Sequence, residues 1–328
     1  MPATLWVIAE TSPEGGLARL SAEVATLVRG LGAAASRDVV GIVVAAPDKA
    51  ARAAAELAAY LPRVIAVDAP AVDTLSPAVV VATAAAGIVA GDVGACVFIG
   101  ASPDGRDAAG VLAALLDMGV LAGAASIAWE DGPVVTKGVF GGRLETTSDL
   151  AGGAGIVTVP LGSVPTVPMA TPGTVETMTT GANAPAAPAV TVLERVVESA
   201  GAVQIEEAKV IVSGGRGVGS AEGFAVAQSL ADELGGAVAA SRAAVDAGWI
   251  PYARQVGQTG KIVKPDVYIA LGISGAVQHK VGMQGARTII AVNSDPDAPI
   301  AEFADMFVIG DLFEVVPALI AELRSRRD

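Results

Sequence analysis

The chain has 328 residues, of which 52% are hydrophobic and 4% aromatic, and its formal net charge is −13. This length predicts two domains, since one domain usually takes ~100–200 residues. The acidic balance argues against a nucleic-acid partner, which needs a basic face. A single histidine and a single cysteine, Cys96, exclude an internal disulfide and most transition-metal sites.

The first 160 residues alternate β-rich runs with alanine-rich helical stretches. The runs predicted as buried strands are residues 5–10, 39–46, 63–69 and 95–101. The stretches predicted as helices are residues 17–31, 48–61, 76–90 and 105–118. Such alternation is typical of a parallel sheet with helices on both faces.

Residues 126–160 lack the strand and helix alternation of the preceding residues. Segments 126–149 and 155–160 have Gly and Asp punctuation and no helical period, which predicts an antiparallel meander. Residues 165–190 are rich in Pro, Gly and Thr, so they are predicted as a crossing strand followed by a linker. We therefore expect a scaffold domain over 1–188 and a second domain over 189–328.

The second domain repeats the strand, glycine corner and helix pattern. Residues 208–220 and 266–276 are each a strand followed by a glycine corner, and a helix follows each corner. Residues 236–249 are predicted as a short strand and a polar turn, and later strands end at Asn293 and near Gly310. The predicted fold class is α/β, with two doubly wound domains built on mainly parallel sheets.

The strand ends of the second domain suit a phosphate-bearing ligand. Ligands of open α/β sheets bind beyond the carboxyl ends of the strands, where glycines and helix N-termini favour phosphate. The first domain offers Glu10 there, which is poorer chemistry for an anion. The corner "GGRGVGS" fits neither GxGxxG nor a P-loop. Two readings of Arg216 therefore stay open, a contact to a phosphate or an ion pair with a surface carboxylate. Ser241 likewise is either a ligand contact or a helix N-cap.

A nucleophilic triad is the catalytic alternative. Ser274, His279 and either Asp295 or Asp311 supply the residue types, but no serine lies in a GxSxG elbow. This reading is therefore disfavoured.

One long stretch carries a family resemblance. "SRAAVDAGWIPYARQVGQTGKIVKPDVYIALGISGAVQHKVGM", followed by "TIIAVNSDPDAPI" and "DLFEVVPAL", closely resembles the alpha subunit of the electron-transfer flavoproteins. "SGGRG" and "LWVIAE" also match, and the departures are Lys280 and a divergent linker. The resemblance implies FAD held mainly by the second domain, in a heterodimer with a beta subunit.

The resemblance also implies a role for each cofactor-binding residue. Arg216 would lie along the phosphate and adenosine side, and Asn293, Asp311 and Leu312 would contact the adenosine. The ribityl–pyrophosphate portion would be cradled by Ser241, Ser274, Gly275, Ala276, Val277 and Gln278. The isoalloxazine would be wrapped by Val256, Gly257, Gln258 and Thr259, with the Thr259 hydroxyl near N5.

Two residues are expected to act on the charge of reduced flavin. The resemblance places His279 at the pyrimidine carbonyl O2 and Arg242 beside the ring. Reduction puts negative charge on that region, which a positioned donor or cation stabilises. Without the resemblance, the favoured reading of His279 is a packed, hydrogen-bonded helix residue.

The resemblance implies an electron carrier rather than an enzyme with its own substrate turnover. The expected donors are acyl-CoA and related dehydrogenases, the expected acceptor is a membrane quinone oxidoreductase, and a cytoplasmic location without a membrane span is expected. Two alternatives stay open. One is a subunit of an electron-bifurcating flavoprotein, and the other is an enzyme of similar fold that uses NAD or another nucleotide-like cofactor such as thiamine diphosphate.

Overall fold

The chain forms two compact units. The computed structural model describes residues 3–12, 14–124, 126–139, 144–150, 152–162, 164–179, 190–194, 205–206 and 208–326. Unit 1 comprises Met1–Val196 and unit 2 comprises Val197–Asp328. The predicted boundary between residues 188 and 189 lies outside the described residues.

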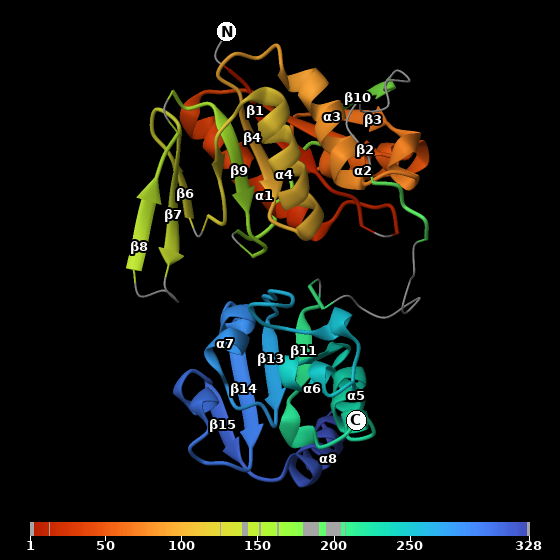
Figure 1. The fold of residues 1–328 in the computed structure, drawn as a ribbon, viewed down its shortest axis with the longest axis vertical. Helices are drawn as coiled ribbons and strands as arrows, with labels where there is room; N and C mark the ends of the chain where they lie inside the picture. Colours follow the sequence, from red (N-terminus) through yellow and green to blue (C-terminus); the bar gives the residue numbers. More distant parts are fainter. Residues whose placement is uncertain are drawn as a thin grey trace. The chain divides into compact units, whose positions relative to one another are not determined.

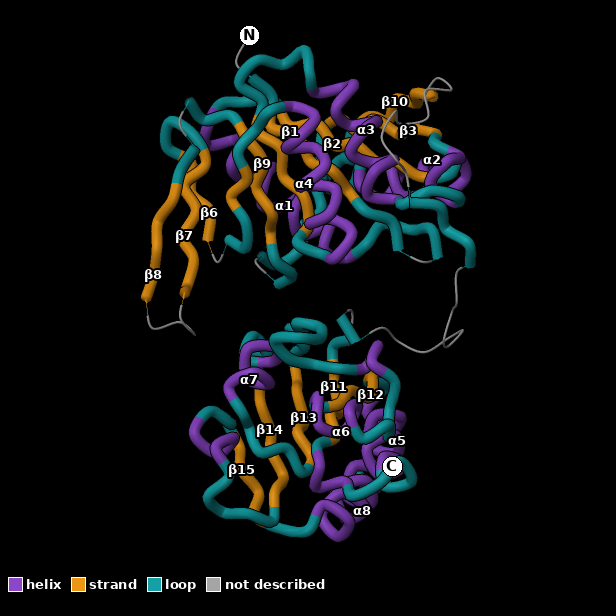
Figure 2. Tube along the Cα trace, viewed as in Figure 1, coloured by secondary structure: helices purple, strands orange, loops and turns teal. Residues whose placement is uncertain are grey.

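Unit 1 is built on a parallel sheet (Figures 1 and 2). Within its described residues the strand order is β10-β3-β2-β1-β4-β9-β5, and every neighbouring pair is parallel. In that order the strands are β10 (Thr174–Thr179), β3 (Arg63–Asp68), β2 (Val39–Ala45), β1 (Leu5–Ala9), β4 (Cys96–Gly100), β9 (Gly155–Val159) and β5 (Val120–Leu121). The parallel sheet predicted for the first domain is confirmed.

Helices cover both faces of this sheet because its central strands are apolar on both sides. Alternate residues of β1 reach opposite cores, with Leu5 and Val7 on one side and Trp6 and Ile8 on the other. The first core is closed by α1 (Arg19–Ala35) and α2 (Pro47–Leu57), and the second by α3 (Pro77–Val89) and α4 (Pro103–Leu116). A short 3-10 helix, η1 (Pro70–Asp73), precedes α3. This is the doubly wound arrangement.

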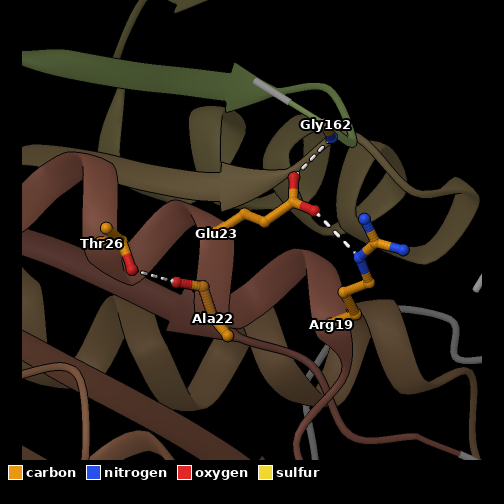
Figure 3. A network of polar contacts seen from close by, with 5 residues as sticks. All are labelled: Arg19, Ala22, Glu23, Thr26 and Gly162. Carbon is orange, nitrogen blue, oxygen red and sulfur yellow. Dashed lines mark hydrogen bonds and ion pairs between the residues drawn. The ribbon is translucent and has the colours of Figure 1, made fainter. Parts of the chain in front are cut away.

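A buried carboxylate fixes α1 against the loop after β9 (Figure 3). Glu23 is 2% exposed, and its Oε1 lies 3.2 Å from Arg19 Nε. The other carboxylate oxygen accepts a hydrogen bond from the backbone N–H of Gly162. A buried charge is tolerated only when it is paired in this way, so the contact specifies where that loop lies.

The antiparallel meander is confirmed in part. β6 (Ser126–Trp129), β7 (Pro133–Val139) and β8 (Leu144–Ser148) form an antiparallel sheet. However, the prediction that 155–160 continues the meander is wrong, because this segment is β9 and pairs in parallel with β4. All five residues of β9 are buried, which is typical of an interior strand of a parallel sheet and cannot be told from an antiparallel strand by pattern alone.

Unit 2 carries a smaller parallel sheet, ordered β12-β11-β13-β14-β15. The strands are β11 (Val210–Gly214), β12 (Ala237–Ala240), β13 (Val267–Leu271), β14 (Thr288–Asn293) and β15 (Met306–Ile309). One face packs against α5 (Phe224–Leu234), α6 (Arg242–Asp246) and α8 (Leu312–Ser325), and the other against α7 (Val277–Met283) and η4 (Pro299–Glu302). The second doubly wound domain is confirmed, although α6 replaces the polar turn predicted after β12.

The described part of the chain contains no helix that is both long and apolar enough to cross a bilayer. The same residues include no cluster of three or more His, Cys, Asp or Glu side chains arranged to hold a metal ion. Cys96 is a free, buried strand residue.

Candidate functional site

A cavity of unit 2 lies at the switch point of its sheet. From β11 the chain runs to β12 on one side, and β13 pairs on the other side, so loops diverge at the carboxyl ends of β11 and β13. The cavity there has a volume of about 530 Å³, within the usual range for small-molecule sites. Its lining is Arg216, Gly217, Ser241, Arg242, Ala243, Asp246, Val256, Gly257, Gln258, Thr259, Gly272, Ile273, Ser274, Ala276, Gln278, His279, Asn293, Asp295 and Ala298.

Two glycine corners pack against one another at the floor of this cavity. The backbone N–H of Gly217 donates to the carbonyl of Gly272 at 3.0 Å. Gly272 has φ +60°, and a Cβ on it would lie 2.6 Å from the Cα of Gly217. Only glycine permits both the left-handed backbone and this approach, so the corners expose backbone rather than side chains to a ligand.

Ser241 contributes a hydroxyl without a protein partner. It occupies the N-cap position of α6, yet its side chain makes no capping hydrogen bond. Its Oγ is buried and has no hydrogen-bond partner within the described residues. An orphaned buried hydroxyl on a cavity wall is costly unless a ligand or water completes it. The N-cap alternative therefore explains its backbone position but not its side chain.

The cavity carries cations and anions together. Arg242 Nε lies 3.2 Å from Asp246 Oδ2, and both side chains are well exposed, so this ion pair contributes little stability. Arg216 follows β11 directly, and no ion pair with it is found among the described residues. The alternative that Arg216 pairs with a surface carboxylate thus finds no support in this part of the chain.

The loop between α6 and β13 presents Thr259 to the cavity. Gln255, which is 2% exposed, donates from Nε2 to Thr259 Oγ1 at 3.1 Å. The hydroxyl of Tyr252 donates to the carbonyl of Thr259 at 2.6 Å. Because the Thr259 oxygen already accepts from Gln255, its own O–H is left to donate into the cavity.

This loop rests directly on α7. Gln258 N–H donates to the carbonyl of Gln278 at 2.7 Å. A Cβ on Gly282 would lie 2.3 Å from the backbone nitrogen of Gly257, so only glycine allows the helix to approach so closely. The loop 256–259 is therefore held as part of the cavity wall.

His279 is buried in that wall, with 6% of its surface exposed. Its Nδ1 lies 3.1 Å from the carbonyl oxygen of Val256, and its Nε2 lies 3.0 Å from the hydroxyl oxygen of Tyr268. Burial lowers the pKa of His279 to about 4, although the Val256 carbonyl acts in the opposite direction. The ring is therefore neutral at ordinary pH, and both nitrogens are engaged within the protein.

The structure brings most of the predicted site residues together. Twelve line the cavity, namely Arg216, Ser241, Arg242, Val256, Gly257, Gln258, Thr259, Ser274, Ala276, Gln278, His279 and Asn293. Four do not line it, namely Gly275, Val277, Asp311 and Leu312. Their contact with a cofactor stays a prediction.

Local structure accounts for these four in other ways. Asp311 caps α8 by accepting from the backbone N–H of Phe313 at 2.8 Å, and Leu312 packs in the core. Gly275 has φ +89°, and a Cβ on it would lie 2.4 Å from the backbone nitrogen of Ile300. Val277 is well exposed.

Sequence reasoning did not assign several lining residues to the cofactor site, and two of these are charged, although Asp295 was considered for a catalytic triad. Asp246 lies four residues after Arg242, which is the helical spacing that predicts an ion pair. Asp295 follows Asn293, and its backbone N–H bonds to the Asn293 side chain at 3.0 Å. The position of Asp295 just past the end of β14 is the sequence signal that could have identified it as a lining residue. The triad reading finds no support, because the nitrogens of His279 bond to Tyr268 and Val256 rather than to Ser274 or an aspartate.

Two protein-family models match the chain. Residues 5–185 match the electron transfer flavoprotein domain, and residues 204–284 match the electron transfer flavoprotein FAD-binding domain. The chain is 42% identical over 327 residues to the electron transfer flavoprotein subunit alpha of Mycobacterium tuberculosis, covering 96% of each chain.

The same description applies to two further relatives. The subunit alpha of Mycobacterium leprae is 41% identical over 318 residues, again with 96% of each chain covered. That of Thermoanaerobacterium thermosaccharolyticum is 56% identical over 134 residues, covering 41% of each chain. The chain therefore belongs to the electron transfer flavoprotein alpha subunits, a family of electron carriers, and unit 2 carries its FAD-binding domain.

Proposed function

We infer that this chain joins a beta subunit, and that the FAD of the heterodimer takes electrons from acyl-CoA and related dehydrogenases and passes them to a membrane quinone oxidoreductase. The observation that carries this proposal is the cavity at the unit 2 switch point. It combines exposed glycine backbone, an orphaned hydroxyl and two arginines, and among its described lining residues the histidine bonds to Tyr268 and Val256 rather than to a nucleophile. Such a site binds and tunes a cofactor rather than turning over a substrate of its own.

The donor set of the cavity fits a phosphate-bearing cofactor. Ser241 Oγ lacks a partner, and the corner glycines Gly217 and Gly272 expose backbone where a side chain would block a ligand. Arg216 adds a permanent positive charge at the same corner. We propose that these residues hold the pyrophosphate region together with the backbone of Ser274, and that Asn293 contacts the adenosine.

Other lining residues fit the redox-active ring. FAD supplies one- and two-electron chemistry when it is bound. The Thr259 hydroxyl, oriented by Gln255, donates a hydrogen bond toward that ring. Arg242 provides positive charge that favours negative charge appearing nearby on reduction. Asp246 opposes this effect, because it neutralises part of that charge.

The test is co-expression with a beta subunit of the same family from the source genome. The purified heterodimer should show flavin absorbance, and the flavin bands should bleach when an acyl-CoA dehydrogenase and its acyl-CoA are added. Dehydrogenase without acyl-CoA is the control. A quinone oxidoreductase with quinone should then restore the bands.

Other outcomes point to the alternatives. Bleaching by NADH with reduction of ferredoxin would favour an electron-bifurcating assembly. A heterodimer without flavin bands that binds NAD or thiamine diphosphate would contradict the carrier function. A cytoplasmic location, which we also propose, is checked by fractionation of the source cells.

A further inference from the structure

The only histidine of the chain has a defined tautomer. The carbonyl oxygen of Val256 has no hydrogen to give, so the Nδ1 atom that lies 3.1 Å from it must carry one. In a neutral imidazole the other nitrogen, Nε2, is then an acceptor, and it lies 3.0 Å from the hydroxyl oxygen of Tyr268. The structure thus assigns the hydrogen without reference to any ligand.

Tyr268 is suited to complete this arrangement. It lies on β13, is fully buried, and packs in the core beneath α7. Burial raises its pKa, so the phenol keeps its proton. A buried tyrosine hydroxyl needs a partner, and donation to His279 Nε2 satisfies it.

The histidine therefore ties three segments together. Its own helix, α7, is joined through Nε2 to β13 and through Nδ1 to the loop that begins at Val256. That loop is the wall that we expect to face the isoalloxazine. With Nδ1–H given to Val256 and Nε2 occupied by Tyr268, the ring has no free N–H.

We propose that Tyr268 is a positioning residue that locks His279 in the Nδ1–H form, so that the imidazole holds the Val256–Thr259 loop and offers the cofactor no N–H unless it gains a second proton. The part about the cofactor rests on the proposed function. The charged groups on the same cavity are Arg216, Arg242, Asp246 and Asp295, and none of them bonds to the ring.

The test uses nitrogen NMR, since one histidine gives one pair of ring signals. The full chain is labelled with ¹⁵N-histidine only and assembled with an unlabelled beta subunit. Between pH 6 and pH 8 we expect Nδ1 to show a protonated shift and Nε2 an unprotonated one, both in the empty complex and with oxidised FAD bound. A protonated Nε2 in either sample would overturn the proposal.

The variant Tyr268→Phe removes the hydroxyl and keeps the ring in the core. Without a donor on Nε2 the neutral form is less stabilised, so the protonation constant of His279 should rise by roughly three- to tenfold, the equivalent of one hydrogen bond. The Nε2 shift should also move toward that of an unbonded nitrogen.

The matched control is Tyr252→Phe, which removes a hydroxyl that bonds to Thr259 and not to the imidazole. It should leave both His279 shifts and the protonation constant unchanged. If Tyr268→Phe behaves like this control, Tyr268 is only a packing residue and the proposal is wrong.

The two proposals fail separately. A heterodimer without flavin would contradict the proposed function, while the wild-type tautomer is still read in the empty complex. A heterodimer with flavin and a protonated Nε2 would overturn the role of Tyr268 alone.

Discussion

Replacing Glu10 with glutamine should remove most of the pH dependence of unit 1 stability near neutrality. Glu10 follows β1, and its Oε2 accepts a hydrogen bond from Ser102 Oγ at 2.6 Å. Its Oε1 is buried without a partner within the described residues. Burial raises the pKa of Glu10 to about 7, the Ser102 bond acts against this shift, and the charge of Asp104 adds to it.

The sign and size follow from linkage. The folded state holds the proton more tightly than the unfolded state, so the stabilisation is present below pH 4.5 and is lost as the pH rises through 7. A shift from 4.5 to about 7 corresponds to about 3 kcal/mol in total. About 2 kcal/mol of this falls between pH 5 and pH 7. Glutamine keeps the shape and cannot ionise, so the variant should gain that amount relative to wild type over this interval.

The assay is urea unfolding followed by tryptophan fluorescence in a Trp249→Phe background. The remaining tryptophans, Trp6 and Trp129, both belong to unit 1. The matched control is Glu145→Gln, which removes an exposed carboxylate on β8. It should follow wild type at every pH. If Glu10→Gln and wild type lose stability in parallel from pH 5 to pH 7, Glu10 is ionised throughout and the reasoning fails.

Three further predictions concern unit 2. Arg216→Ala should weaken FAD binding about ten- to a hundredfold, because it removes one charge-assisted contact to a phosphate, and it should not change the spectrum of the flavin that stays bound. Repeated ultrafiltration measures FAD retention. Unchanged retention would contradict a phosphate contact. Arg242→Ala should lower the one-electron midpoint potential of the flavin, by about 59 mV for each tenfold loss of affinity for the reduced state relative to the oxidised state. Asp246→Asn should raise this potential. Redox titration measures both shifts, and shifts of the same sign would refute the opposed roles of the two residues. Gly275→Ala should destabilise unit 2 by about 1 kcal/mol or more, because Gly275 has φ +89° and an added Cβ would meet Ile300. The control is Gly30→Ala on α1, where an added Cβ would have no atom within 4 Å, and it should not destabilise the protein. If thermal melting ranks the two variants otherwise, the strain at Gly275 is refuted.

Local patterns predicted the strands and helices where the sequence period was clear. The strand predicted over 5–10 is observed as β1, and the helix predicted over 17–31 is observed as α1, which begins two residues later and ends at Ala35. The error at β9 is instructive, because a short apolar strand is compatible with either sheet, and only its pairing with β4 decides. Pairing over more than fifty residues of sequence is not a local property.

The site was predictable where chemistry follows the strand ends. Glycine corners, Ser241 and Arg242 all lie just past β-strands, and the rule for doubly wound sheets brings them together. The partners of His279 were not predictable, since Tyr268 and Val256 lie 11 and 23 residues away and meet the ring only after folding. The family resemblance placed His279 at the cofactor as a donor, whereas the residues alone favoured a packed, hydrogen-bonded helix residue. In the folded chain both of its nitrogens are engaged within the protein.

The two doubly wound sheets differ in the chemistry of their switch points. Each has a switch point, and in unit 1 it lies between the carboxyl ends of β1 and β4. There Glu10 and Ser102 bond to each other, and Ser102 caps α4 by accepting from the backbone N–H of Gly105. A Cβ at Gly105 would lie 2.8 Å from Glu10 Oε1, so the Glu10 carboxyl group occupies the space beside the N-terminus of α4 where a phosphate would bind. With Asp104 in the first turn of α4, that corner repels an anion, whereas in unit 2 the equivalent corners hold Arg216 and an unpaired hydroxyl. The same fold thus presents different chemistry at its two switch points, because the residues at the strand ends differ in charge and hydrogen-bonding capacity.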